Sequence, residues 1–214
     1  MKVMGKGIDY ASKNNSTESN LAAIKEAGYS FIGRYYGESD WKRLTKAEAQ
    51  RISKAGLYIV ALYQDNARDI SDFTESKGKA AAKSAISQAV NIGQPFGTPI
   101  YFAVDMEVVT VAQRKAVISF FTGIKEVFDE YKLRNNGVYE IGVYGGYETV
   151  TLITEHFPRS VSFVFQTVAW SPRPYKSRDL YQSAIDKTLK LINGSTIKVD
   201  FCESTGSAGG FQVK

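Results

Sequence analysis

Residues 100 to 107 read Ile-Tyr-Phe-Ala-Val-Asp-Met-Glu, and the rest of the chain is organised around them. The apolar part follows Pro99 and is too short for a helix, so the pattern predicts a buried strand. Asp105 and Glu107 come at its end, at positions i and i+2. Because side chains alternate along a strand, both carboxylates are expected to face the same way, roughly 6.6 Å apart.

Two carboxylates at this spacing suit general acid–base chemistry. The carboxyl pairs of glycosidases lie about 5 to 9.5 Å apart. The surroundings of such a pair keep one acid protonated while the other stays ionised. Acids at a strand end are more commonly solvated, or capped by an arginine or a helix N-terminus. Other parts of the chain must therefore support the catalytic interpretation.

Composition limits the classes of protein to consider. The chain has 214 residues, 43% of them hydrophobic, which suits one domain with a sizeable core. No apolar run approaches the roughly 20 residues that span a bilayer, and no signal peptide is visible at the start. The net charge of +5 comes from scattered residues, so nucleic-acid binding is not expected. The charge favours either a polyanionic surface, such as a bacterial cell wall, or simple solubility.

The single cysteine and single histidine exclude several kinds of site. Cys202 has no partner for an internal disulfide. Together with the lone His156, it argues against a zinc site and against a Ser-His-Asp or Cys-His relay. We therefore expect no metal and no cofactor, and any acid chemistry has to be done by carboxylates. We also expect a monomer without a membrane span.

Strand-like and helix-like segments alternate through the first 155 residues. Strand patterns occupy 7–11, 30–36, 57–64, 99–107 and 139–146, and each is followed by a helical pattern. Three more strand-like runs follow without convincing helices, and Asn193-Gly194 is a turn signal between two of them. The alternation implies a parallel sheet, and eight strands suggest closure. We predict an α/β, TIM-like barrel of five β/α units followed by three strands, over residues 1–205, with residues 206–214 as a loose, Gly-rich tail.

The carboxyl ends of the predicted strands collect polar and aromatic residues. Chemistry in such barrels sits at that end. The candidates are the acids Asp9, Asp105, Glu107 and Asp200, with Arg34, Tyr36, Gln64, Tyr144, Trp170 and Gln182 as substrate-binding residues. Aromatic faces stack on sugar rings, and amides hydrogen-bond hydroxyl and N-acetyl groups. Singly, Tyr144 and Trp170 could be core residues and Asp9 or Asp200 could pair with Arg34, but their convergence predicts a glycan site.

Several of these stretches carry a family resemblance. They are Gly7-Ile8-Asp9-Tyr10, Phe31-Ile32-Gly33-Arg34-Tyr35-Tyr36, residues 97–105, Gly142-Val143-Tyr144-Gly145 and Val199-Asp200. Together they resemble the glycoside-hydrolase-like barrel domain related to family 25 glycoside hydrolases, the Chalaropsis-type lysozymes or N-acetylmuramidases. The resemblance implies that Asp9, Asp105, Glu107 and Asp200 match the family's acids, with Glu107 as proton donor. Tyr10 departs from the small apolar residue usual in the lysozymes.

The resemblance implies a peptidoglycan glycoside hydrolase, lysozyme-like and released to the cell wall, whether bacterial or phage-encoded. Two alternatives stay open. One is a barrel that binds or regulates at wall glycan without turnover, and the other is a glycosidase for a different polysaccharide.

Overall fold

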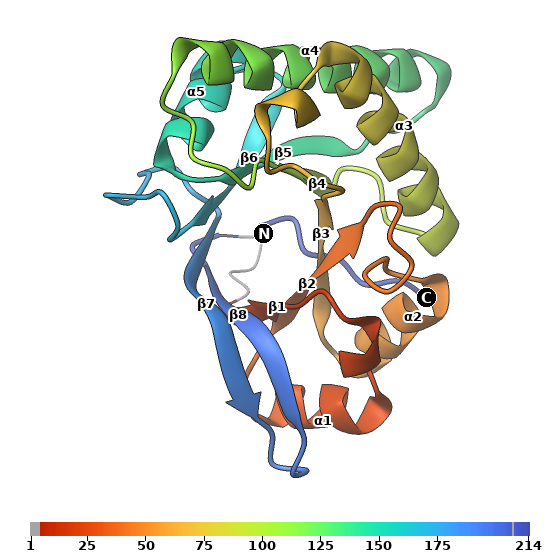
Figure 1. The fold of residues 1–214 in the computed structure, drawn as a ribbon. Helices are drawn as coiled ribbons and strands as arrows, with labels where there is room; N and C mark the ends of the chain where they lie inside the picture. Colours follow the sequence, from red (N-terminus) through yellow and green to blue (C-terminus); the bar gives the residue numbers. More distant parts are fainter. Residues whose placement is uncertain (1–4, 207) are drawn as a thin grey trace.

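Eight strands close into one barrel in the computed structural model, which describes residues 5–206 and 208–214. The strands follow the order of the sequence around the barrel (Figure 1). They are β1 (Lys6–Asp9), β2 (Phe31–Tyr36), β3 (Tyr58–Tyr63), β4 (Pro99–Ala103), β5 (Glu140–Gly145), β6 (Val161–Thr167), β7 (Leu180–Lys190) and β8 (Thr196–Ser204). This confirms the predicted TIM-like barrel.

Five helices connect the first six strands and lie outside the barrel. They are α1 (Glu18–Glu26), α2 (Lys46–Lys54), α3 (Glu75–Ile92), α4 (Val111–Arg134) and α5 (Tyr147–His156). Two short 3-10 turns, η1 (Lys13–Asn15) and η2 (Ile70–Asp72), precede α1 and α3. Threonine side chains cap α1 to α4, each accepting a hydrogen bond from a backbone N–H of the first turn. None of the described helices is long and apolar enough to cross a bilayer.

The last strand, β8, breaks the parallel pattern. Strands β1 to β7 pair in parallel with their neighbours, but β8 runs antiparallel to both β7 and β1. The reversal follows from the turn at Gly194, whose φ of +84° suits glycine. Figure 1 shows the outer part of β7 and β8 extending away from the barrel as a two-stranded ribbon.

Aromatic side chains fill much of the barrel. Tyr101 makes edge-to-face contacts with Phe163 and Phe165, and Tyr144 contacts Phe165 from the other side. Glycine provides the room for these rings, because a Cβ on Gly142 would lie 2.6 Å from the Tyr101 ring. The interior is thus a packed core below the carboxyl ends of the strands, which leaves those ends as the place for a cavity.

Residues 208–214 pack on the barrel, whereas the sequence predicted a loose tail over residues 206–214; residue 207 lies outside the described residues. Ala208 and Phe211 are buried, and Phe211 forms an antiparallel bridge with Ile59 near the start of β3. The Tyr101 hydroxyl donates to the carbonyl of Ala208 over 2.9 Å. The described part of the tail therefore packs against the amino ends of β3 and β4, where its apolar residues are removed from water.

Candidate active site

A cavity of about 680 Å³ opens at the carboxyl ends of the strands. The sequence predicted ten residues for this site, and seven of them line it. Those seven are Asp9, Gln64, Asp105, Tyr144, Trp170, Gln182 and Asp200. They come from β1, β5, β7 and β8 and from the segments that follow β3, β4 and β6, so the fold brings together residues spread over the whole chain.

Gln182 organises one side of the cavity. Its Nε2 donates to Asp9 Oδ2 over 3.0 Å and to Asp200 Oδ2 over 2.9 Å. Its Oε1 accepts from the hydroxyls of Tyr144 (2.8 Å) and Thr167 (2.6 Å). The side chain is only 1% exposed. One buried amide therefore uses all four of its strong hydrogen-bonding positions and joins two acids from neighbouring strands.

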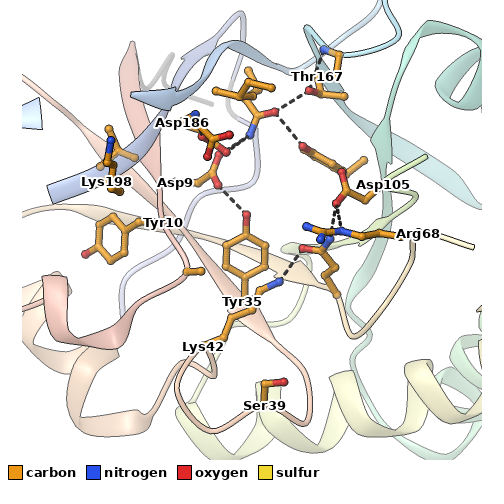
Figure 2. Close-up of a pocket in the computed structure, with 18 of the residues that line it drawn as sticks. Asp9, Tyr10, Tyr35, Ser39, Lys42, Arg68, Asp105, Thr167, Asp186 and Lys198 are labelled. Atoms are coloured by element: carbon orange, nitrogen blue, oxygen red, sulfur yellow. Dashed lines mark hydrogen bonds and ion pairs between the residues drawn. The ribbon is translucent and has the colours of Figure 1, made fainter. Parts of the chain in front are cut away.

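Asp9 is the more deeply buried of these two acids, with 1% exposure. Besides the amide of Gln182, it accepts hydrogen bonds from the Tyr35 hydroxyl (2.7 Å, Figure 2) and the Cys202 thiol (3.2 Å). Burial raises the pKa of Asp9, although these three hydrogen bonds work in the opposite direction. Both of its carboxylate oxygens accept hydrogen bonds from protein groups, which suits a residue that positions neighbouring side chains.

Asp200 lies across the β1–β8 pair from Asp9 and is half-buried. Its Oδ1 accepts from the backbone N–H of Asp186 over 2.7 Å, at an irregularity in β7 where Asp186 has a φ of +53°. Burial, followed by repulsion from Asp9, raises the pKa of Asp200 to about 7. Asp200 therefore carries its proton about half the time at neutral pH and faces the cavity, as a general acid must.

Asp105 occupies another part of the cavity wall. Its Oδ2 accepts from Arg68 Nε over 2.9 Å (Figure 2) and from Gln64 Nε2 over 3.1 Å. Its backbone N–H bonds to the carbonyl of Ala67, in the segment between β3 and α3. The cavity therefore holds one acid, Asp105, that is paired with a cation, and another, Asp200, that accepts hydrogen bonds only from neutral donors.

Glu107 is placed differently from the sequence prediction. Strand β4 ends at Ala103, so Asp105 and Glu107 follow the strand instead of alternating along it. The backbone leaves β5 after Val104 and bonds to the β3–α3 segment, which ends the two-residue periodicity. Asp105 lines the cavity, whereas Glu107 is exposed and is not among the lining residues.

Arg34 and Tyr36 are also absent from the cavity lining. Both are fully buried on the outer face of β2. Arg34 forms an ion pair with Glu48 of α2 at 2.7 Å, and the Tyr36 hydroxyl donates to Gln94. Strand alternation instead sends the side chain between them, Tyr35, into the cavity. The sequence prediction chose the wrong face of this strand.

Charged residues of the loops and the β7–β8 ribbon complete the cavity. Lys42 and Arg68 come from the segments after β2 and β3, and Asp186 and Lys198 come from the ribbon. Trp41 and Trp170 add aromatic surface at the rim, exposed by 59% and 36%. The loop residues lie several positions beyond the strand ends and carry no periodic pattern, so sequence periodicity had no signal for them. Among the described residues, no group of three His, Cys, Asp or Glu side chains is arranged to hold a metal ion.

Comparisons with known proteins agree with this architecture. The family model described as "Rv2525c-like, glycoside hydrolase-like domain" matches residues 22–202. The uncharacterized protein FadG of Bacillus subtilis is 29% identical over 163 residues, which is 74% of this chain but 28% of FadG. The chain thus spans less than a third of that relative.

Two solved structures show the same fold. The Tat-secreted protein Rv2525c of Mycobacterium tuberculosis, in complex with L-tartrate, superposes with a TM-score of 0.75 at 23% identity, covering 97% of this chain and 98% of that one. A family 25 glycosyl hydrolase from Bacillus anthracis superposes with a TM-score of 0.61 at 16% identity, covering 96% and 90%.

Proposed function

The chain belongs to the Rv2525c-like, glycoside hydrolase-like family, and on that basis we propose that it hydrolyses the glycan of the bacterial cell wall in a lysozyme-like reaction. The observation that carries the proposal is the pair of carboxyl groups on one cavity, Asp200 and Asp105, held in different surroundings. Glycoside hydrolysis needs one protonated and one ionised carboxyl beside the scissile bond.

In this proposal Asp200 protonates the glycosidic oxygen. It faces the cavity and is half-buried, and burial and Asp9 raise its pKa to about 7. Asp105, paired with Arg68, lies on the same cavity and stabilises positive charge that develops on the sugar ring. Asp9 and Gln182 position Asp200. Tyr144, Trp170 and Trp41 offer aromatic surface to the sugar rings, and Gln64 offers an amide.

Peptidoglycan is the substrate class that we favour. Lysozymes of the related family act on it, and one structural neighbour, the autolysin LytC of Streptococcus pneumoniae, was solved with a synthetic peptidoglycan ligand. LytC superposes with a TM-score of 0.62 at 14% identity, covering 93% of this chain and 46% of LytC. Because several relatives are secreted or wall-lytic by their names, we further propose that this chain acts outside the cell.

A second function, glycan binding without turnover, is favoured by one observation. Glu107, which the family resemblance implies as proton donor, is exposed and does not line the cavity. A barrel that has lost its donor would keep the aromatic and amide contacts and so still bind sugar.

Release of reducing ends from purified peptidoglycan separates these possibilities. We expect the wild-type protein to release them, Asp200→Asn to lower the rate by about a hundredfold or more, and Glu107→Gln to leave it nearly unchanged. Mass spectrometry of the products identifies the sugar at the new end. Near-UV circular dichroism checks that each variant is folded.

The contrary outcomes are distinct. Loss of activity in Glu107→Gln with activity kept in Asp200→Asn would return the donor role to Glu107. Binding to peptidoglycan without new reducing ends would favour the non-catalytic barrel. The pH profile adds a test without mutation, since an acid with a pKa near 7 predicts a rate that falls as pH rises past neutrality.

A further inference from the structure

Lys42 places a positive charge at the cavity without an ion-pair partner. Its Nζ donates to Gln64 Oε1 over 2.6 Å and lies 3.9 Å from the centroid of the Tyr35 ring. In the described part of the chain, Lys42 forms no ion pair with a carboxylate. An ammonium group has three N–H donors. The hydrogen bond to Gln64 uses one of them, and the group also lies over the Tyr35 ring.

The acids around Lys42 accept hydrogen bonds from other groups. Asp9 accepts from Tyr35, Gln182 and Cys202, and Asp105 accepts from Arg68 and Gln64. Asp65 accepts from the Tyr63 hydroxyl and from the backbone N–H of Glu38. These three acids attract the Lys42 charge from a distance, and Arg68 repels it. The charge is therefore not neutralised by contact and remains free to meet an anion.

The position of Lys42 is fixed by the fold. Its backbone carbonyl accepts a hydrogen bond from Arg34 Nη2 over 3.0 Å, and Arg34 is itself anchored by Glu48. The side chain is half-buried between the Tyr35 ring and Gln64. Because packing already orders this half-buried side chain, it loses little conformational entropy when it binds an anion. Burial lowers the pKa of Lys42 to about 8, so it stays mostly charged at neutral pH.

Arg68 provides a second donor at the mouth of the cavity. Its side chain is 76% exposed, and only its Nε is used in the ion pair with Asp105. Within the described chain, its two terminal nitrogens make no hydrogen bond. Gln64 accepts from Lys42 and donates to Asp105, which pairs with Arg68, so hydrogen bonds link the two cations. Figure 2 shows Lys42, Arg68 and Asp105 around the cavity. An anion that meets both would relieve the repulsion between them.

We propose that Lys42, assisted by Arg68, binds a carboxylate carried by the glycan, so that the site prefers acidic sugars to neutral ones. This inference rests on the proposed function and names the substrate feature that the same cavity recognises. The carboxylate belongs either to the sugar itself, as on the lactyl group of N-acetylmuramic acid, or to a peptide attached to it. Hydrolysis is not required for this recognition.

Calorimetric titration with three probes tests the proposal at low ionic strength and mildly acidic pH. The probes are N-acetylmuramic acid, its neutral methyl ester, and N-acetylmuramoyl dipeptide, in which the lactyl carboxyl is amidated and the carboxylates are on the peptide. We expect at least one carboxylate probe to bind about tenfold tighter than the ester, the size of a charge-assisted hydrogen bond. Which of the two binds tighter identifies the source of the carboxylate.

Two variants assign the preference to Lys42. Lys42→Met should lower the affinity for the carboxylate probe to that for the ester, and the affinity for the ester should not change. Lys42→Arg should keep most of the preference for the carboxylate probe. Lys187→Met removes the same charge from the exposed ribbon, outside the cavity, and should keep the preference entirely. A preference that survives in Lys42→Met, or equal binding of acid and ester by the wild type, overturns the inference.

The proposed function fails separately. If no probe binds, glycan recognition by this cavity is wrong and the inference falls with it. If acid and ester bind equally, sugar recognition stands and only the role of Lys42 is wrong.

Discussion

The substitution Gln182→Glu tests the arrangement at the centre of the site. The change keeps the size of the side chain but replaces an amide that donates to Asp9 and Asp200 with a third carboxyl. When the introduced carboxyl is protonated, it can still donate one hydrogen bond and loses the other. We expect a cost of about 2 kcal/mol in the free energy of unfolding in that state, since one buried charged acceptor loses its donor.

The cost should rise with pH. Burial beside two acids raises the pKa of the introduced carboxyl above its value in the unfolded chain, so the folded protein retains a proton that the unfolded chain releases. For a raised acid pKa, stability is present at low pH and is lost as pH rises from about 4 through the folded-state pKa. A rise of two units corresponds to about 3 kcal/mol of destabilisation over the whole titration, of which about 2 kcal/mol falls between about pH 5 and about pH 8.

Urea unfolding at these two pH values measures the difference. Gln166→Glu is a matched control, because Gln166 is equally buried but contacts the backbone of Arg173 and Tyr175 instead of acids. It isolates the effect of burial, so its pH dependence should be smaller. Equal stability of Gln182→Glu at both pH values would mean that the amide does not lie between two carboxyl groups.

Three further outcomes follow from the packing. Arg34→Met leaves Glu48 buried without its partner and should lower the free energy of unfolding by about 3–5 kcal/mol in urea; a loss below about 1 kcal/mol would show that water reaches the pair. Gly78→Ala should cost about 2–3 kcal/mol, because the new Cβ would lie 2.0 Å from the carbonyl oxygen of Phe120 on α4; an unchanged thermal midpoint would contradict this close helix contact. Asp200→Asn removes an acid with a raised pKa, so its thermal midpoint relative to the wild type should increase from about pH 5 to about pH 8; a constant difference would contradict the raised pKa.

The sequence predicted the barrel and seven residues of the cavity because both depend on order along the chain. Strands that alternate with helices must return to the same edge, so residues at strand ends meet there. Asp9, Gln64 and Gln182 could be placed by this rule alone.

The errors arose where local periodicity carried no information. Strand β2 is buried at all six positions, so it has no polar side to mark which face meets the helices. To predict that Arg34 faces the helices and Tyr35 faces the cavity, one must know that Arg34 pairs with Glu48 of α2, which lies 14 residues later in the sequence. In the same way, the end of β4 is set by the bond from Asp105 N–H to Ala67, a contact with another loop.

Two glutamines give the cavity walls their different chemistry. Each amide donates through Nε2 to carboxylates, but Gln64 accepts from the Lys42 ammonium and Gln182 accepts from two hydroxyls. The wall with Gln64 therefore couples an acid to cations, and the wall with Gln182 couples acids only to neutral groups. On the wall with Gln182, burial raises the pKa values of Asp9 and Asp200. The same asymmetry would orient an acidic sugar, because its negative charge is attracted to Lys42 and repelled by the wall that holds Asp9 and Asp200.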